Sequence, residues 1–157
     1  MNNAGKPGIT PFLWFDGDVE EAANFYRSVF KDARIESVHR PAPGKPAQSA
    51  TVTLRGQRLH LFNGGPHHKL TPAVSLMVDC ETQAEVDDLW DKLTAGGAKS
   101  RCGWLQDRYG LSWQIVPRIL PRLLRDPDPA KAHAALQAML QMDKIDIKRL
   151  EQACAGA

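Results

Sequence analysis

The stretch FLWFDGDVEEAANFYRSVF (residues 12–30) joins an apolar segment, an acidic turn and a helical pattern, and SLMVDCETQAEVDDLWDKL (residues 75–93) repeats that order. Phe15-Asp16 corresponds to Val78-Asp79, with one extra residue in the second turn. Residues 56–62 (GQRLHLF) and 110–116 (GLSWQIV) share a second pattern: glycine, two residues, then apolar, polar, apolar, apolar. Two copies of a strand–helix–strands unit predict two half-sheets that share a surface, and such a surface is where a ligand binds.

The composition is typical of one globular domain over residues 1–157. Hydrophobic residues make up 43% of the chain and charged residues 24%, and a chain of this length buries roughly two thirds of its unfolded surface. The 20 basic and 18 acidic side chains give a net charge of +2. This balance does not indicate nucleic acid or an anionic membrane as a partner.

Three cysteines indicate the compartment. Cys80, Cys102 and Cys154 are far apart, odd in number and outside any CxxC motif, so we expect reduced thiols. The Gly/Asn/Pro-rich residues 1–8 predict a loose tail without the apolar core of a signal peptide. No segment approaches the roughly 18 apolar residues of a membrane span. The sequence therefore predicts a cytoplasmic protein with no nucleic-acid or membrane partner.

The first module is expected over residues 9–65 and the second over 71–117. In the first, the elements follow in chain order: a strand over 9–15, a helix capped by Asp18 over about 19–30, and strands over about 34–40, 49–55 and 58–63. In the second they are a strand over about 72–79, a helix over about 82–95 closed by Gly96-Gly97, and strands over about 99–106 and 112–117. Residues 118–157 form a helical extension with no counterpart in the first half.

The extension is expected to hold two helices. Asp128-Pro129 is a good N-cap and first-turn pair for a helix over 130–142, and Asp146 is placed to cap a short helix over 147–154. The first of these helices is rich in Ala, Leu and Met. It is therefore expected to cover either its own sheet or a partner subunit.

His60 and Gln114 are polar residues between apolar neighbours at equivalent places in the two repeats. If the apolar neighbours face the helices, both polar side chains face the opposite, concave side. Alternation puts Phe12 and Trp14 on that side as well. The functional interpretation is an aromatic pocket with a few hydrogen-bonding groups. The alternative is a satisfied polar contact inside a filled core.

Several segments resemble the PhnB-like branch of the vicinal oxygen chelate superfamily, which includes glyoxalase I, bleomycin-resistance proteins and extradiol dioxygenases. They are ITPFLWFDGDVEEAANFY, LFNGGP, CGWLQDRYGLSWQIVP and DPDPAKAHAALQAMLQMDKIDI, and the resemblance runs from Ile9 to about Leu150. It implies an α+β fold in which two βαβββ modules form curled mixed or antiparallel sheets around a cavity, with C-terminal helices added. It also implies a homodimer, and members often carry a demethylubiquinone methyltransferase label.

The same resemblance indicates whether the chain carries the ligands of a metal site. In metal-using members four cavity-facing positions hold a divalent ion, and they correspond here to Thr10 (or Pro11), His60, Ala73 and Gln114. Divalent sites need several imidazole, thiolate or carboxylate donors, and only His60 is a good one. We therefore expect no bound metal, and no other cofactor.

A further segment, Cys102 to Gly110, is rich in functional residue types. A nucleophilic Cys102 needs a base or a lowered pKa, and no histidine lies near it in the sequence. The resemblance implies a pocket wall with Trp104 pointing inward. The candidate ligand-binding residues are therefore Phe12, Trp14, His60, Phe62, Asn63, Ser75, Met77, Cys102, Trp104 and Gln114.

Three functions remain open. The first is a metal-independent protein that binds an aromatic or amphipathic metabolite. The second is a lyase- or isomerase-like enzyme with His60 as acid or base, since a single histidine can transfer protons near neutral pH. The third is the methyltransferase of the label. It is disfavoured because the first strand enters its helix through Asp16-Gly17-Asp18, not through the Gly-rich turn of a nucleotide-binding parallel sheet.

Overall fold

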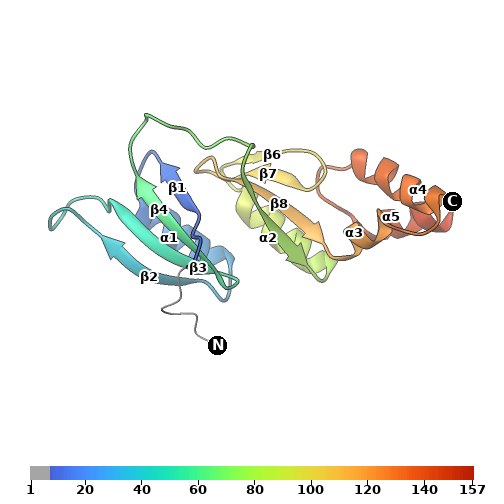
Figure 1. Ribbon diagram of the computed structural model, residues 1–157, viewed down its shortest axis with the longest axis horizontal. Coiled ribbons are helices and arrows are strands. Elements are labelled where there is room, and N and C mark those ends of the chain that lie inside the picture. Colours follow the sequence, from blue (N-terminus) through green and yellow to red (C-terminus); the bar gives the residue numbers. More distant parts are fainter. Residues whose placement is uncertain (1–7) are drawn as a thin grey trace. The chain divides into compact units, whose positions relative to one another are not determined.

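The computed structural model describes residues 8–157, so the predicted tail over residues 1–8 lies, apart from Gly8, outside the described residues. The chain divides between Leu70 and Thr71 into two compact units, unit 1 and unit 2. Each unit contains one four-stranded mixed sheet (Figure 1). This α+β architecture confirms the predicted fold class. The predicted cavity stays a prediction.

Unit 1 is a βαβββ module. Its elements are β1 (Phe12–Phe15), α1 (Val19–Val29), β2 (Arg34–His39), β3 (Ser49–Leu54) and β4 (Gln57–Asn63). The strand order is β1-β4-β3-β2. β1 runs parallel to β4, and the other neighbours are antiparallel. The crossover through α1 is what allows the parallel pair.

Local chemistry sets the ends of these elements. Asp18 begins α1, because its Oδ1 accepts from the backbone N–H of Glu20 at 2.8 Å. Arg55 and Gly56 have φ angles of 47° and 79°, so both central residues of the β3–β4 turn are left-handed, as in the tight turns that join antiparallel strands. That two-residue turn fixes the register of β3 against β4.

The sheet of unit 1 has one covered face and one open face. The covered face packs under α1, whose buried residues include Ala22 and Tyr26. The residues buried on this face of the strands are Leu13, Phe15, Ala50, Val52, Leu54, Leu59 and Leu61. Since side chains alternate along a strand, the residues between them belong to the open face. The predicted strand alternation is confirmed.

Unit 2 repeats the module and adds helices. Its elements are β5 (Ser75–Cys80), α2 (Gln83–Thr94), β6 (Ala98–Lys99), β7 (Trp104–Gln106), β8 (Ser112–Pro117), α3 (Ile119–Leu123), α4 (Pro129–Leu140) and α5 (Ile147–Ala155). The strand order is β5-β8-β7-β6. β5 is parallel to β8, and the remaining pairs are antiparallel.

One predicted strand is wrong. Residues 99–106 do not form a single strand, because Cys102 and Gly103 take left-handed φ angles of 57° and 84° and split the stretch into β6 and β7. Their N–H groups donate to the carbonyls of Met142 and Asp143, both at 2.7 Å. Contact with the C-terminal extension therefore interrupts the strand, and the local sequence does not show that contact.

The C-terminal helices pack on one another and on the end of β8. Asp128 and Asp146 cap α4 and α5 through their side chains, as predicted. The short helix α3 was not predicted, because its five residues follow directly from β8 and contain Pro121. A core cluster joins these parts and consists of Val116, Leu120, Met142, Ile145 and Leu150. No helix within residues 8–157 is long and apolar enough to cross a membrane.

Candidate functional site

On the open face of unit 1, three residues lie in one row across the sheet. The sequence predicted two of them, Phe12 and His60, and did not predict the third, Thr51. Phe12 lies directly beside His60 in the β1–β4 register, and His60 lies directly beside Thr51 in the β3–β4 register. The Thr51 hydroxyl, on a residue that is 5% exposed, is 3.2 Å from His60 Nδ1. This contact holds the imidazole in one orientation beside the Phe12 ring.

A second row lies two residues further along the strands. Trp14 is beside Phe62, with their ring centroids 5.2 Å apart and nearly perpendicular. Phe12 connects the two rows, since its ring lies 5.0 Å from the His60 ring and 5.5 Å from the Phe62 ring. These spacings are within the range of favourable aromatic pairs. We call Phe12, Trp14, His60 and Phe62 together the aromatic platform.

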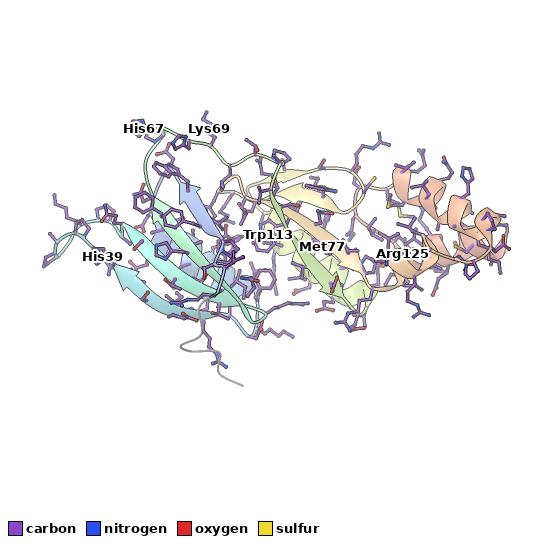
Figure 2. The ribbon with its side chains drawn as sticks, viewed as in Figure 1. His39, His67, Lys69, Met77, Trp113 and Arg125 are labelled. Carbon is purple, nitrogen blue, oxygen red and sulfur yellow. The ribbon has the colours of Figure 1, made fainter. Side chains whose placement is uncertain are left out.

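The segment after β4 folds over one end of the platform. The Trp14 indole N–H donates to the Gly65 carbonyl at 2.9 Å, and the ring of His68 meets the indole edge-on at 4.8 Å. Gly64 passes so close that a Cβ there would lie 2.1 Å from the indole. Asn63 does not join the platform, because its Oδ1 accepts from the Gly17 N–H at the turn before α1. His67 and Lys69 lie on the same segment (Figure 2).

The platform is open to solvent on the β1 side, at the edge of the sheet. Phe12 is 58% exposed, an unusual value for a large aromatic side chain. His60, Phe62 and Trp14 are half-buried. The four side chains therefore form a surface on which a flat molecule can lie, and they do not fill the core of unit 1.

The open face of unit 2 is built differently. Gln114 Nε2 donates to the Ser75 hydroxyl at 2.9 Å, while Met77, the direct neighbour of Gln114, is 61% exposed. Trp104 pairs with Gln114 from the other side. A shallow hollow of about 280 Å³ lies beside Trp104 and is lined by Pro72, Ala98, Lys99, Ser100, Trp104, Leu105, Gln106 and Ser112.

Cys102 lies at the turn between β6 and β7 and faces the C-terminal extension. Its Sγ is 3.6 Å from the Met139 carbonyl, and its N–H donates to Met142. A carbonyl oxygen does not activate a thiol for attack. The position of Cys102 thus points to a docking role for the turn.

The four positions that correspond to the metal site of metal-using members offer few donors for a divalent ion. Thr10 and Ala73 precede β1 and β5 and are exposed, and of the corresponding positions only His60 carries a strong donor. Within residues 8–157 no three His, Cys, Asp or Glu side chains gather closely enough to hold an ion.

Sequence reasoning missed two residues of this surface. Thr51 could have been found, because a two-residue turn at 55–56 pairs residue 51 with residue 60. His68 carries no such signal, since its place over Trp14 depends on the path of the loop after β4.

Comparison with known proteins identifies the relatives of this chain. Residues 7–116 match the family model described as 3-demethylubiquinone-9 3-methyltransferase. No curated protein matches. A Bacillus cereus structure described as a putative 3-demethylubiquinone-9 3-methyltransferase, PhnB protein, is 39% identical, and the match covers 71% of this chain and 99% of that one with a TM-score of 0.64.

More distant structures share the fold. A Pseudomonas aeruginosa protein is 20% identical over 71% of this chain and 98% of its own, with a TM-score of 0.60. The fosfomycin resistance protein FosX of Listeria monocytogenes, in a complex with Mn(II) and sulfate, is 14% identical over 76% of this chain and 96% of its own, with a TM-score of 0.54.

Proposed function

Since this chain belongs to the 3-demethylubiquinone-9 3-methyltransferase-like (PhnB-like) family of the vicinal oxygen chelate superfamily, we propose that it binds an aromatic or amphipathic small molecule without a metal ion. Family and fold make it a protein of the glyoxalase/bleomycin-resistance type. The observation that carries the proposal is the aromatic platform, with the exposed Phe12 ring in contact with both His60 and Phe62.

The energetics of the platform favour a flat ligand. Burying apolar surface contributes about 25 cal/mol per Å², and aromatic pairs add about 0.5–1.5 kcal/mol beyond that area term. His60 and Thr51 give the platform one polar end, where a hydrogen bond orients the ligand. The unit 2 residues Ser75 and Gln114 already bond to each other, so we assign the primary contacts to unit 1.

Acid–base catalysis at His60 is a second candidate, because its ring is oriented by Thr51 and faces the open side of the sheet. A positioned imidazole can act as a general acid or base. His60→Ala separates the two functions. A binding protein loses affinity with this change, whereas an enzyme of the lyase or isomerase type loses turnover and keeps most of its affinity.

Methyl transfer is not part of the proposal. The known S-adenosylmethionine geometry uses a parallel sheet with a Gly-rich turn at a helix N-terminus. Here α1 begins at Asp18, and each sheet has one parallel pair among its three. Calorimetry with S-adenosylmethionine is the direct check, and a micromolar affinity would revive methyl transfer.

The binding test uses the Trp14 indole N–H as a local reporter. Flat aromatic compounds are titrated into the ¹⁵N-labelled protein, with the Trp14 peak assigned by Trp14→Phe. We expect ligands to shift the Trp14 and Gly65 resonances. Phe12→Leu should weaken binding by about three- to ten-fold, and Phe25→Leu, the same change on α1, should not. Compounds that move no resonance of unit 1 would refute the proposal.

We also propose a homodimer and a cytoplasmic location. Leu136 and Leu140, one turn apart on α4, are 38% and 39% exposed and suit a contact with a second copy of the chain. Cys80, Cys102 and Cys154 form no disulfide with one another, which fits a reducing compartment. Light scattering at several concentrations tests the dimer, and a persistent monomer contradicts it.

A further inference from the structure

The polar end of the aromatic platform offers a hydrogen-bond donor to the ligand. The Thr51 hydroxyl is hydrogen-bonded to His60 Nδ1, and the centroid of the Phe12 ring lies 5.0 Å from that of the imidazole. Nε2 of His60 makes no hydrogen bond to any residue in the described part of the chain. Both contacts fix the ring while leaving Nε2 for a molecule on the platform.

The Thr51 hydroxyl determines what Nε2 can do. A hydroxyl both donates and accepts. When it donates to Nδ1, the neutral imidazole carries its proton on Nε2. When it accepts from Nδ1–H, Nε2 of the neutral ring is an acceptor, whereas the imidazolium donates from both nitrogens. Two of these three states carry a proton on Nε2, and an anionic oxygen on the platform selects them, because an N–H donor bonds most strongly to such an oxygen.

The acidic side chain on this face does not oppose an anion. Glu36 reaches the open face beside Thr53, whose hydroxyl donates to its Oε1 at 2.5 Å. Its other oxygen is 3.0 Å from Arg58 Nε. Arg58 pairs with Thr53, two residues along the strands from the His60–Thr51 pair. The Glu36 charge is thus compensated before a ligand arrives.

The opposite end of the platform is basic as well. His68 contacts the far edge of Trp14, and Lys69 follows it on the same exposed segment (Figure 2). An anion on the platform therefore has an imidazole at each end. A cation in the same place would meet these basic groups, and the nearby Glu36 carboxylate is already engaged by Arg58.

Building on the function proposed above, we propose that the ligand is a flat aromatic anion, of the aromatic carboxylate class. Its ring lies on Phe12, Phe62 and Trp14, and one carboxylate oxygen accepts the hydrogen bond from His60 Nε2. Binding is non-covalent, and no bond in the ligand changes.

The test compares two ligands of the same shape, 2-naphthoate and 2-naphthamide, at one pH and one ionic strength. Affinities come from NMR titrations that follow the Trp14 indole N–H. We expect the wild-type protein to bind the carboxylate about ten-fold more tightly than the amide. His60→Phe keeps a flat ring and removes the donor, so it should bring the two affinities to about the same value. His60→Gln should give an intermediate ratio.

The outcomes separate this inference from the function on which it rests. If the amide binds as tightly as the carboxylate, the anion preference is wrong and the binding function stands. If neither ligand shifts the Trp14 resonance, the binding function itself fails. A shift confined to Trp104, beside the hollow of unit 2, overturns the assignment to the platform. Unchanged amide resonances of α1, which packs on the covered face of the unit 1 sheet, show that each variant is folded.

Discussion

Replacing Gly64 by alanine tests the geometry that holds the aromatic platform in place. The new Cβ would lie 2.1 Å from two carbons of the Trp14 indole. Ordinary carbon–carbon contact is about 3.5–4.0 Å, so the indole must move by more than about 1 Å. A movement of that size stretches the 2.9 Å hydrogen bond from Trp14 Nε1 to the Gly65 carbonyl beyond bonding range.

The cost follows from these two effects. Forced repacking costs about 1–3 kcal/mol, and the lost hydrogen bond adds about 1 kcal/mol. We therefore expect Gly64→Ala to lower the free energy of unfolding by about 2–4 kcal/mol. If the indole swings into solvent, the loss lies at the low end of this range, and the Trp14 N–H resonance moves to a solvent-exposed position.

Urea denaturation measures the change, and a double-mutant cycle with Trp14→Leu isolates the clash. Without the indole, the three atoms nearest to the added methyl group are gone, and we expect the smaller entropy of the unfolded chain to make Gly64→Ala neutral or stabilising by up to about 1 kcal/mol. An equal destabilisation in both backgrounds would show that backbone conformation, and not contact with Trp14, selects glycine here.

Four further predictions concern unit 2 and the metal. Asp107→Asn should destabilise by about 2–4 kcal/mol in urea, because its buried carboxylate accepts from Trp113 Nε1 at 2.8 Å and an amide nitrogen there would oppose that donor; an unchanged midpoint would contradict this. Gln83→Ala should lower the free energy of unfolding by about 1–3 kcal/mol and speed amide hydrogen exchange across α5, because the Gln83 side chain bonds to the backbone of residues 145 and 147. Unchanged exchange would show that these two hydrogen bonds do not hold α5 in place. Hydrogen bonds to Lys144 and then Gln83 lower the pKa of Asp87, and the bond to Asp87 raises the pKa of Lys144. The pair therefore stabilises from above the unfolded carboxyl pKa, about 4, to below the unfolded amine pKa, about 10. Asp87→Asn should remove less than about 1 kcal/mol at pH 7, since both groups are over a third exposed, and its effect should shrink as the pH falls below about 4; a pH-independent effect would refute the linkage. Metal analysis after purification without chelator should find Mn, Fe, Ni and Zn below stoichiometric amounts, and one equivalent of any of them would refute the donor argument.

The sequence alone determined the modules and the faces of their strands. Periodicity of two residues puts His60 and Gln114 opposite their apolar neighbours whatever the rest of the chain does, and the structure has both on the open faces. Capping by Asp18, Asp128 and Asp146 is equally local, because a carboxylate reaches only the first free N–H groups of its own helix.

Only the tertiary structure decided the register of the parallel strands, and with it which residues lie side by side across them. The repeat equates Trp14 with Met77 and His60 with Gln114, yet His60 pairs with Phe12, whereas Gln114 pairs with Met77. The parallel strands of the two units therefore differ by a shift of two residues. A shift of two keeps each side chain on its face and changes its neighbours, so the sequence pattern could not detect it.

The same holds for the interrupted strand and the folded loop. Cys102 turns because the distant carbonyl of Met142 receives its N–H, and His68 lies on Trp14 because Gly64 lets the chain pass close to the indole. Each is a contact between residues far apart in sequence, which local propensity and periodicity do not encode. Strand faces and helix caps come from short-range chemistry; the aromatic platform and its imidazole ends come from the packing of the folded chain.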